Sequence, residues 1–561
     1  MKLILPIIAL SVLVSGKTTR STTTKSTTTR ATAVPTVKLD YTTLVPAAGN
    51  SSLGYYKYQN IRFAAAPTGD LRWAQPQWPT KEKSINNGSL ASSSVACSST
   101  EDCLFMDIWV PANAQGKKLP VMVWTYGGGF TGGSKNENTP EGLFNLSTSF
   151  IYVAYNYRLG ITGLANGVTV PHEGGTTNTA LWDVQHAFQW TKKYISAFGG
   201  DPNQVTAVGF SAGASQVLFQ LTRFAGRAEQ LFNRAYVMSP GFVPGAGHHH
   251  AEAFWQNVST SVGCAGGHLS CIRKVNFTTL TTAASTVQSK YTYQFQPRVD
   301  GDFVGDTYEA QFYQNRFNFT GPMVIAHEAH EANSQAWSGV NTTADVSTYL
   351  KIFFPAITDD VVQQALNLYP ESGYTSPGLR FADMKQSFDL TAHNLAVTNA
   401  LKNQTWNGLV ALGGATHGTD QSYYWYSTYS LSTTSSSSGM AGSTSGNSTS
   451  GSTVGGPPSG MSGPSGSSSG NSTSSAGGMG GGGMGGSTSV DSTLAIKMQK
   501  YLLSFVLTGN PNTMWPKDKL TWPKYSTGSN GVNLVFNTTF TTKEDDLANQ
   551  KSLFWNKALW Y

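Results

Sequence analysis

The strongest constraint on the fold is a β-branched run that breaks at a serine flanked by glycines. Residues 205–208 (Val-Thr-Ala-Val) predict a buried strand, and Gly209-Phe210-Ser211-Ala212-Gly213 follows it directly before an apolar helical stretch. A serine in such a strand-to-helix turn is held in a strained conformation, and glycines on both sides let strand and helix approach closely. The run therefore predicts that Ser211 presents its hydroxyl as a nucleophile.

The pattern alone is weak, because the chain contains 59 glycines. Gly466-Ser467-Ser468-Ser469-Gly470 matches it as well, but no predicted strand precedes this second match and no apolar helix follows it. The structural context therefore selects Ser211.

Strand-like and helical patterns alternate from about residue 38 to residue 431. Dense apolar runs predict buried strands, and helical spacing of Leu181, Val184, Phe188 and Ile195 lies between two of them. The predicted strands are 120–124, 150–155, 205–208 and 235–238. This alternation predicts an α/β fold with a mainly parallel central sheet flanked by helices.

The amino terminus has the features of a secretory signal. Lys2 precedes an apolar stretch from Leu3 to Val14, and the small residues Ser15 and Gly16 end it. We expect a signal peptide at 1–16, a disordered threonine-rich tail at 17–37 and a secreted, extracellular protein. No other apolar run approaches about 20 residues, so no stable membrane anchor is expected.

Residues 432–490 change abruptly to Ser, Gly, Thr and Met with almost no charge, which predicts disorder. Periodic sequence resumes at Leu494 and continues to Tyr561. Roughly 70 residues are few for an independent core, which favours an insertion over a linker between two domains. We therefore expect one domain over 38–561, interrupted at 432–490.

Four cysteines allow three pairings in an oxidising compartment, and their spacing favours two local bridges, Cys97 with Cys103 and Cys264 with Cys271. Eleven sequons predict a glycoprotein: Asn50, Asn87, Asn145, Asn257, Asn276, Asn318, Asn341, Asn403, Asn447, Asn471 and Asn537. The net charge of +6 comes from only 12% charged residues without a dense basic cluster in the folded part, so we expect no nucleic-acid partner.

A serine nucleophile needs a base, a carboxylate that orients the base, and backbone donors for the oxyanion. His417 follows the apolar run 409–412 through a Gly-Gly turn, and Glu331 follows the run 323–326 in the same manner. The order Ser211, Glu331, His417 is the nucleophile, acid and base order of an α/β-hydrolase. Glu328 and Asp420 remain alternative orienting carboxylates.

Several further motifs carry a family resemblance: Ile61-Arg62-Phe63-Ala64-Ala65-Ala66-Pro67, Glu101-Asp102-Cys103-Leu104, Asn156-Tyr157-Arg158-Leu159-Gly160 and Phe198-Gly199-Gly200-Asp201-Pro202. From about residue 38 to the end, the chain resembles a type B carboxylesterase and lipase of the cholinesterase-like α/β-hydrolase family. The resemblance implies a Ser211, Glu331 and His417 triad, and an oxyanion hole formed by the amides of Gly128, Gly129 and Ala212.

The sequence departs from the family's common pattern at three positions. Tyr126 stands where histidine usually precedes the glycines, Phe210 where glutamate usually precedes the nucleophile, and Ala332 where glycine often follows the acid. None of the three changes removes a proton-transfer group or a required backbone amide, so catalysis should survive them.

No metal and no cofactor are expected. His248-His249-His250 suggests zinc, but adjacent histidines rarely point all three rings at one tetrahedral ion, and a solvated loop is the preferred interpretation. His327 and His330 are expected to line the loop that carries the acid.

The sequence thus predicts a secreted serine carboxylic ester hydrolase that forms an acyl-enzyme and acts on a small-molecule or lipid ester. Two alternatives remain: a lipase on long-chain acylglycerols, with Ala91 to Thr100 as a lid, or a catalytically silent cholinesterase-like binding or adhesion protein. The Ser-rich composition of 91–100 favours soluble or short-chain esters. No oligomeric state is predicted.

Overall fold

The computed structural model describes residues 35–243, 248–291, 293–428, 490–527 and 530–557. The expected signal peptide at 1–16, nearly all of the tail at 17–37 and all of the insertion at 432–490 except residue 490 lie outside the described residues.

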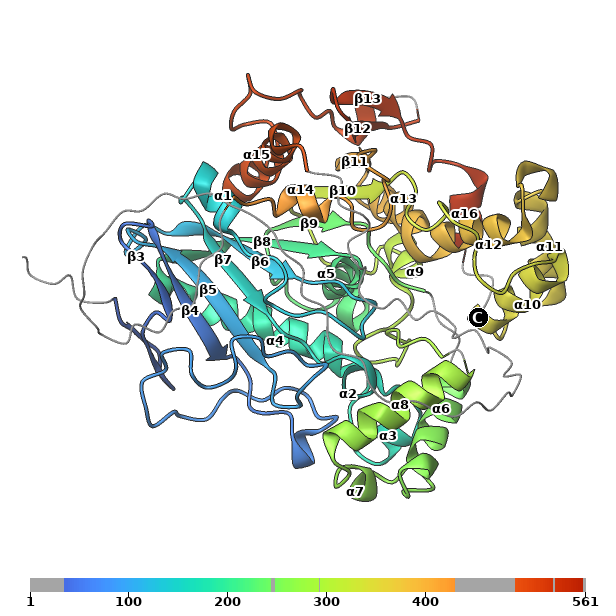
Figure 1. Ribbon diagram of the computed structural model, residues 1–561, viewed down its shortest axis with the longest axis horizontal. Coiled ribbons are helices and arrows are strands. Elements are labelled where there is room, and N and C mark those ends of the chain that lie inside the picture. Colours follow the sequence, from blue (N-terminus) through green and yellow to red (C-terminus); the bar gives the residue numbers. More distant parts are fainter. Residues whose placement is uncertain (1–34, 244–247, 292, 429–489, 528–529, 558–561) are drawn as a thin grey trace, which may run out of the picture. The chain divides into compact units, whose positions relative to one another are not determined.

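A sheet of eleven strands organises the described part in the order β13-β12-β11-β10-β9-β8-β6-β7-β5-β4-β3 (Figure 1). Strands from β7 to β12 pair in parallel, and antiparallel strands complete both edges. The strands are β3 (Ala48–Asn50), β4 (Tyr55–Arg62), β5 (Phe105–Pro111), β6 (Leu119–Thr125), β7 (Ile151–Tyr155), β8 (Gly200–Phe210), β9 (Arg234–Met238), β10 (Met323–Glu328), β11 (Trp406–Val410), β12 (Val532–Phe536) and β13 (Thr541–Glu544). A small separate sheet pairs β1 (Val37–Lys38) with β2 (Thr43–Leu44).

Helices flank the sheet, which confirms the predicted α/β architecture (Figure 1). Helix α4 packs against α2 and α5, while α15 packs against α1, α14 and β6. The helices are α1 (Glu141–Leu146), α2 (Gly160–Leu164), α3 (Thr169–His172), α4 (Thr179–Tyr194), α5 (Ala212–Thr222), α6 (His248–Ser261), α7 (Leu269–Ile272), α8 (Phe277–Tyr291), α9 (Tyr308–Tyr313), α10 (Thr343–Phe353), α11 (Asp359–Leu368), α12 (Pro377–Gln386), α13 (Ala392–Ala400), α14 (Gln421–Tyr424), α15 (Ser492–Thr508) and α16 (Gln550–Asn556). None of the helices in the described ranges is both long enough and apolar enough to span a bilayer.

The chain after residue 490 completes the same sheet as the chain before residue 429. Strand β12 pairs in parallel with β11, and α15 packs against α14. The buried side chain of Gln499 in α15 donates hydrogen bonds to three carbonyl oxygens at the end of the preceding segment, those of Tyr423 at 3.4 Å, Tyr424 at 3.3 Å and Tyr426 at 2.7 Å. This amide thus adds a direct link between the two chain segments to the strand pairing and helix packing.

The histidine triplet lies in a helix, so the expectation of a solvated loop is wrong. His248, His249 and His250 form the first turn of α6. The apolar residues that follow, Ala251, Phe254, Trp255 and Val258, recur at helical spacing and are buried, so they extend the helical pattern up to the histidines.

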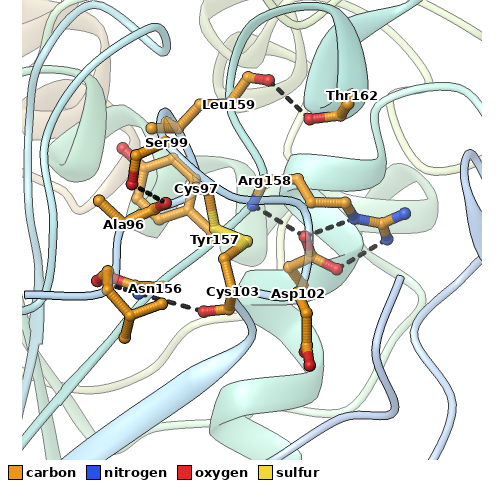
Figure 2. The surroundings of a disulfide bond; sticks show 12 residues. Ala96, Cys97, Ser99, Asp102, Cys103, Asn156, Tyr157, Arg158, Leu159 and Thr162 are labelled. Carbon is orange, nitrogen blue, oxygen red and sulfur yellow. Dashed lines mark hydrogen bonds and ion pairs between the residues drawn. A yellow bond between two sulfur atoms is a disulfide. The ribbon is translucent and has the colours of Figure 1, made fainter. Parts of the chain in front are cut away.

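Both expected cysteine pairs form disulfides. Cys97 pairs with Cys103 and Cys264 with Cys271, at Cα separations of 5.1 and 5.7 Å. Figure 2 shows the first bridge beside Asn156 and Arg158. The Asn156 side chain donates to the carbonyl oxygens of Val95 at 2.9 Å and Cys103 at 3.1 Å, which holds the disulfide loop against the end of β7.

A buried carboxylate organises the antiparallel side of the sheet. Asp107 in β5 accepts hydrogen bonds from the Lys135 ammonium at 2.7 Å and from the backbone amide of Asn60 at 2.8 Å, and it forms an ion pair with Lys57 at 3.1 Å. Burial raises the pKa of Asp107, but the charges of Lys135 and Lys57 outweigh burial and hold the pKa below its ordinary value. Asn60 has a positive φ of 51° within the irregular part of the β4–β5 pairing, so Asp107 also holds this bulge.

Replacing Asp107 by alanine should destabilise the protein severely, because two lysine ammonium groups then remain in the interior without their partner. Removal of one member of a buried ion pair costs about 3–5 kcal/mol. The measurement is the free energy of unfolding in urea. Glu229→Ala removes the exposed Lys192–Glu229 pair and should change that free energy by about 1 kcal/mol or less. Equal effects of the two substitutions would contradict the assigned role of Asp107.

Candidate active site

Ser211 lies at the turn between β8 and α5, in a conformation that few non-glycine residues adopt. Its φ is 55° and its ψ is −129°. A Cβ atom on Gly213 would lie 2.2 Å from the carbonyl oxygen of Thr125, and one on Gly209 would lie 2.6 Å from that of Gly213. The two glycines are therefore required by the close approach of α5 to β6 and β8, as the sequence predicts.

Three side chains from the ends of three strands meet at this turn. The His417 Nε2 atom lies 2.8 Å from Ser211 Oγ, and its Nδ1 atom lies 2.6 Å from Glu331 Oε2. Ser211 follows β8, Glu331 follows β10, and His417 follows β11. Parallel strands place their carboxyl ends at the same edge of a sheet, so these residues meet although more than a hundred positions separate some of them. The arrangement can transfer a proton from Ser211 to His417.

The charge of Glu331 makes His417 a stronger base. Burial lowers the pKa of His417, but the negative charge of Glu331 and its hydrogen bond to Nδ1 outweigh burial, so the pKa lies above its ordinary value of 6.5. Asp389 and Asp420 contribute further negative charge in the same direction. His417 therefore takes up a proton readily and is held in the tautomer that presents Nε2 to Ser211.

The loop after β6 brings backbone amides to the same place. Gly128 and Gly129 have φ values of 106° and 59°, and a Cβ atom on Gly127 would lie 2.9 Å from Ser211 Cβ. Among the described residues, no group accepts a hydrogen bond from the amide of Gly128 or Gly129. Ala212 is the first residue of α5, so its amide has no partner within the helix. The Ala212 amide adjoins Ser211, and Gly127 brings the start of the glycine loop against the Ser211 side chain.

Phe210 has a contact that the sequence does not reveal. Its ring stacks on the His417 imidazole, with 4.8 Å between ring centroids and 30° between planes. A Cβ atom on Gly418 would lie 3.2 Å from Phe210 Cζ, so a residue without a side chain follows His417. Phe210 thus supports the base from one face.

Tyr126, which also departs from the family pattern, has a structural role. It is fully buried, stacks on Tyr157 at 4.5 Å, and the two residues exchange hydrogen bonds between hydroxyl and carbonyl oxygen at 3.2 and 2.9 Å. The pair joins the end of β6 to the chain after β7. At the third departure, the Ala332 amide donates to Gln386 Oε1 at 3.1 Å.

The two alternative carboxylates, Glu328 and Asp420, are linked to Glu331 through backbone amides and not to His417. Glu328 donates its amide to Glu331 Oε1 at 2.7 Å, and Asp420 donates its amide to Glu328 Oε1 at 2.7 Å. Neither carboxylate forms a hydrogen bond or an ion pair with His417 among the described residues, so Glu331 is the carboxylate that orients the imidazole.

Sequence reasoning missed Gly241 and Leu390. A Cβ atom on Gly241 would lie 3.3 Å from both Ser211 Oγ and the Leu390 side chain. Gly241 follows β9, and its position just beyond a strand end is the only sequence signal that points to it. Leu390 lies in the π-helix Ser387–Thr391, an irregularity that no pattern in the sequence predicts.

No group of three His, Cys, Asp or Glu side chains could hold a metal ion within the part of the chain that the structure describes. His327 is buried near Asn394, with 3.3 Å between His327 Nδ1 and the Asn394 amide nitrogen. His327 lies within β10 itself and not in the loop that carries Glu331, whereas His330 lies in that loop and is exposed.

Comparisons with known proteins place these features in a family. The model of the carboxylesterase family matches residues 43–555. A secreted lipase from Arthroderma benhamiae is 30% identical over 342 residues, which cover 58% of this chain and 66% of the lipase, slightly under two thirds of its length. Carboxylesterase patB from Aspergillus clavatus is 27% identical over 402 residues, which cover 60% of this chain and 72% of patB.

Among solved structures, EstA from Aspergillus niger matches with a TM-score of 0.74 and 22% identity, over 94% of this chain and 98% of EstA. This likeness concerns the fold and agrees with the sheet and helices described above. The chain therefore belongs to the carboxylesterase family, a class of carboxylic ester hydrolases with the α/β-hydrolase fold.

Proposed function

We propose that the protein is a secreted serine carboxylesterase. The observation that carries the proposal is the hydrogen-bonded chain from Ser211 through His417 to Glu331, with distances of 2.8 and 2.6 Å, next to the glycine loop after β6. The same constellation of nucleophile, base and acid performs acyl transfer on unrelated folds.

In this mechanism Ser211 Oγ attacks the ester carbonyl carbon while His417 Nε2 takes the hydroxyl proton. The amides of Gly128, Gly129 and Ala212 stabilise the oxyanion of the tetrahedral intermediate. His417 then donates its proton to the departing alcohol, which leaves an acyl-Ser211 ester. His417 Nε2 then deprotonates a water molecule that attacks this ester, and it returns the proton to Ser211 Oγ as the acid departs.

The region around the expected lid favours soluble or short-chain esters over an oil surface. Asn60 donates from its side-chain amide to the carbonyl oxygens of Ala91 at 2.8 Å and Ser92 at 3.2 Å, while Asn156 holds Val95. Val95 and Cys97 are buried. A lid must detach from the core to open, and these attachments oppose that. Because one relative is named as a secreted lipase, long-chain acylglycerols are the second candidate substrate class.

Secretion is supported by several independent features. The apolar amino terminus, the two disulfides and the relative named as a secreted lipase all fit an extracellular enzyme. The sequon residues Asn87, Asn276 and Asn341 are exposed, which suits glycosylation.

Ser211→Ala should abolish hydrolysis of p-nitrophenyl esters, because the nucleophile is lost while the fold remains. The expected fall in kcat is at least on the order of a thousandfold. Hydrolysis of a chain-length series by the wild-type protein identifies its preferred acyl group, and Ser84→Ala, at an exposed serine, is the control. A preference for long chains would favour the lipase, and equal near-background rates in both proteins would favour a binding protein.

Glu331→Gln should lower activity and shift the pH profile toward acid. His417 acts as a base only when neutral, so kcat/KM falls as the pH drops through its pKa. Without the Glu331 charge, burial lowers that pKa, and the acid limb should move to lower pH. We expect kcat/KM near neutral pH to fall by about 10²- to 10⁴-fold. Glu371→Gln, at an exposed position, should change neither quantity, and an unmoved acid limb in Glu331→Gln would contradict the assignment.

Gly241→Ala should reduce the size of the acyl group that the site accepts. The added methyl would lie 3.3 Å from Ser211 Oγ and from Leu390, closer than most side-chain contacts. We expect kcat/KM to fall for all esters, and to fall more for p-nitrophenyl butyrate than for the acetate. Gly373→Ala is the matched control, because a Cβ atom there meets nothing within 4 Å. An unchanged ratio between the two esters would place the acyl group elsewhere.

A further inference from the structure

Three carboxyl groups are buried together around one imidazole. Glu328, Glu331 and Asp420 are 0%, 3% and 1% exposed, and they come from the end of β10, the loop after it and the residue before α14. Among the described residues, no lysine or arginine forms an ion pair with any of them. Three buried negative charges beside a single histidine are too costly, so at least one group retains a proton.

The hydrogen bonds identify which group this is. Glu331 accepts at both oxygens, from the Glu328 amide and from His417, and Asp420 accepts from the Gln421 side chain at 2.9 Å. Glu328 Oε1 accepts the Asp420 amide, and the Glu328 and Asp420 carboxyl groups also share a hydrogen bond, which requires a proton on one of the two. A carboxylic acid needs one acceptor oxygen and one oxygen for its proton, which matches Glu328.

The charges point the same way. Burial, followed by the negative charges of Asp420 and Glu331, raises the pKa of Glu328 well above its ordinary value. Burial raises the pKa of Asp420 only to about 6, so Asp420 is ionised at neutral pH. The hydroxyls of Tyr423 and Tyr424 also face Glu328, and burial raises the pKa of each hydroxyl, so both stay neutral.

We propose that Glu328 is a positioning residue that works as a neutral carboxylic acid, joining the loop that carries Glu331 to the loop that carries His417. This inference rests on the triad proposed above. The backbone amide of Glu328 donates to Glu331 Oε1. The side chain of Glu328 accepts, at its own Oε1 atom, a hydrogen bond from the backbone amide of Asp420, which lies three residues after His417. The His417 amide in turn donates to the Glu331 carbonyl oxygen at 3.2 Å. Glu328 thereby sets the imidazole against Ser211 without adding a negative charge.

The test is the pH dependence of kcat/KM for p-nitrophenyl acetate in Glu328→Gln, Glu328→Ala and Asp420→Asn. Glutamine resembles a protonated glutamate, so the acid limb of Glu328→Gln should coincide with that of the wild type. Alanine removes the acceptor for the Asp420 amide, and kcat should fall about ten- to a hundredfold through misplacement of His417. Asp420→Asn removes an ionised neighbour of His417, so its acid limb should move to lower pH.

Glu371→Gln serves as the control for the amide substitution at an exposed position. An acid limb of Glu328→Gln displaced to lower pH would mean that Glu328 is charged in the wild type and would overturn the proposal, as would a wild-type kcat in Glu328→Ala. If Glu328→Ala does not fold, the acid limbs of the other two variants still decide. Activity remaining in Ser211→Ala would instead refute the triad, whatever the Glu328 variants show.

Discussion

The close approach of α5 to the ends of β6 and β8 is the contact on which the site depends. Gly213 lies against the carbonyl oxygens of Thr125 and Tyr126, where even a methyl group would collide with the backbone. The turn between β8 and α5 that permits this contact holds Ser211 at a φ of 55°, and the contact brings the start of the helix next to the glycine loop. One packing contact therefore positions the proposed nucleophile beside the loop that carries the proposed oxyanion donors.

Buried charge is arranged differently in the two halves of the sheet. On the antiparallel side, Asp107 is balanced by Lys57 and Lys135, and next to α4 the Arg158 guanidinium donates to both oxygens of Asp183 at 2.8 and 2.7 Å. Opposite charges there neutralise one another, so the loss of one partner would leave an uncompensated charge in the interior. At the carboxyl ends of β10 and β11, no lysine or arginine in the described part of the chain pairs with Glu328, Glu331 or Asp420, and the charges of Glu331 and Asp420 raise the pKa of His417.

The sequence predicted the architecture and the three residues that meet at the site because these depend on local patterns and on strand order. Apolar runs define the strands, and parallel strands bring Ser211, Glu331 and His417 to one edge. The stacking of Phe210 on His417 and the placement of Gly241 beside Ser211 were beyond prediction, because they depend on side chains from different loops. The histidine triplet was misread because its helix is stabilised by apolar residues after it, not by the histidines themselves.

The amide of Gln499 has a consequence for the evolution of the chain. It donates to carbonyl oxygens of Tyr423, Tyr424 and Tyr426, so the described chain before residue 429 and the described chain after residue 489 meet at α15. When two chain segments are held together, the entropic cost of closing the loop between them grows only with the logarithm of the number of residues in the loop. Sequence can therefore be gained or lost between these points with little effect on stability. The same position is a natural place to graft a foreign peptide or a whole carrier domain.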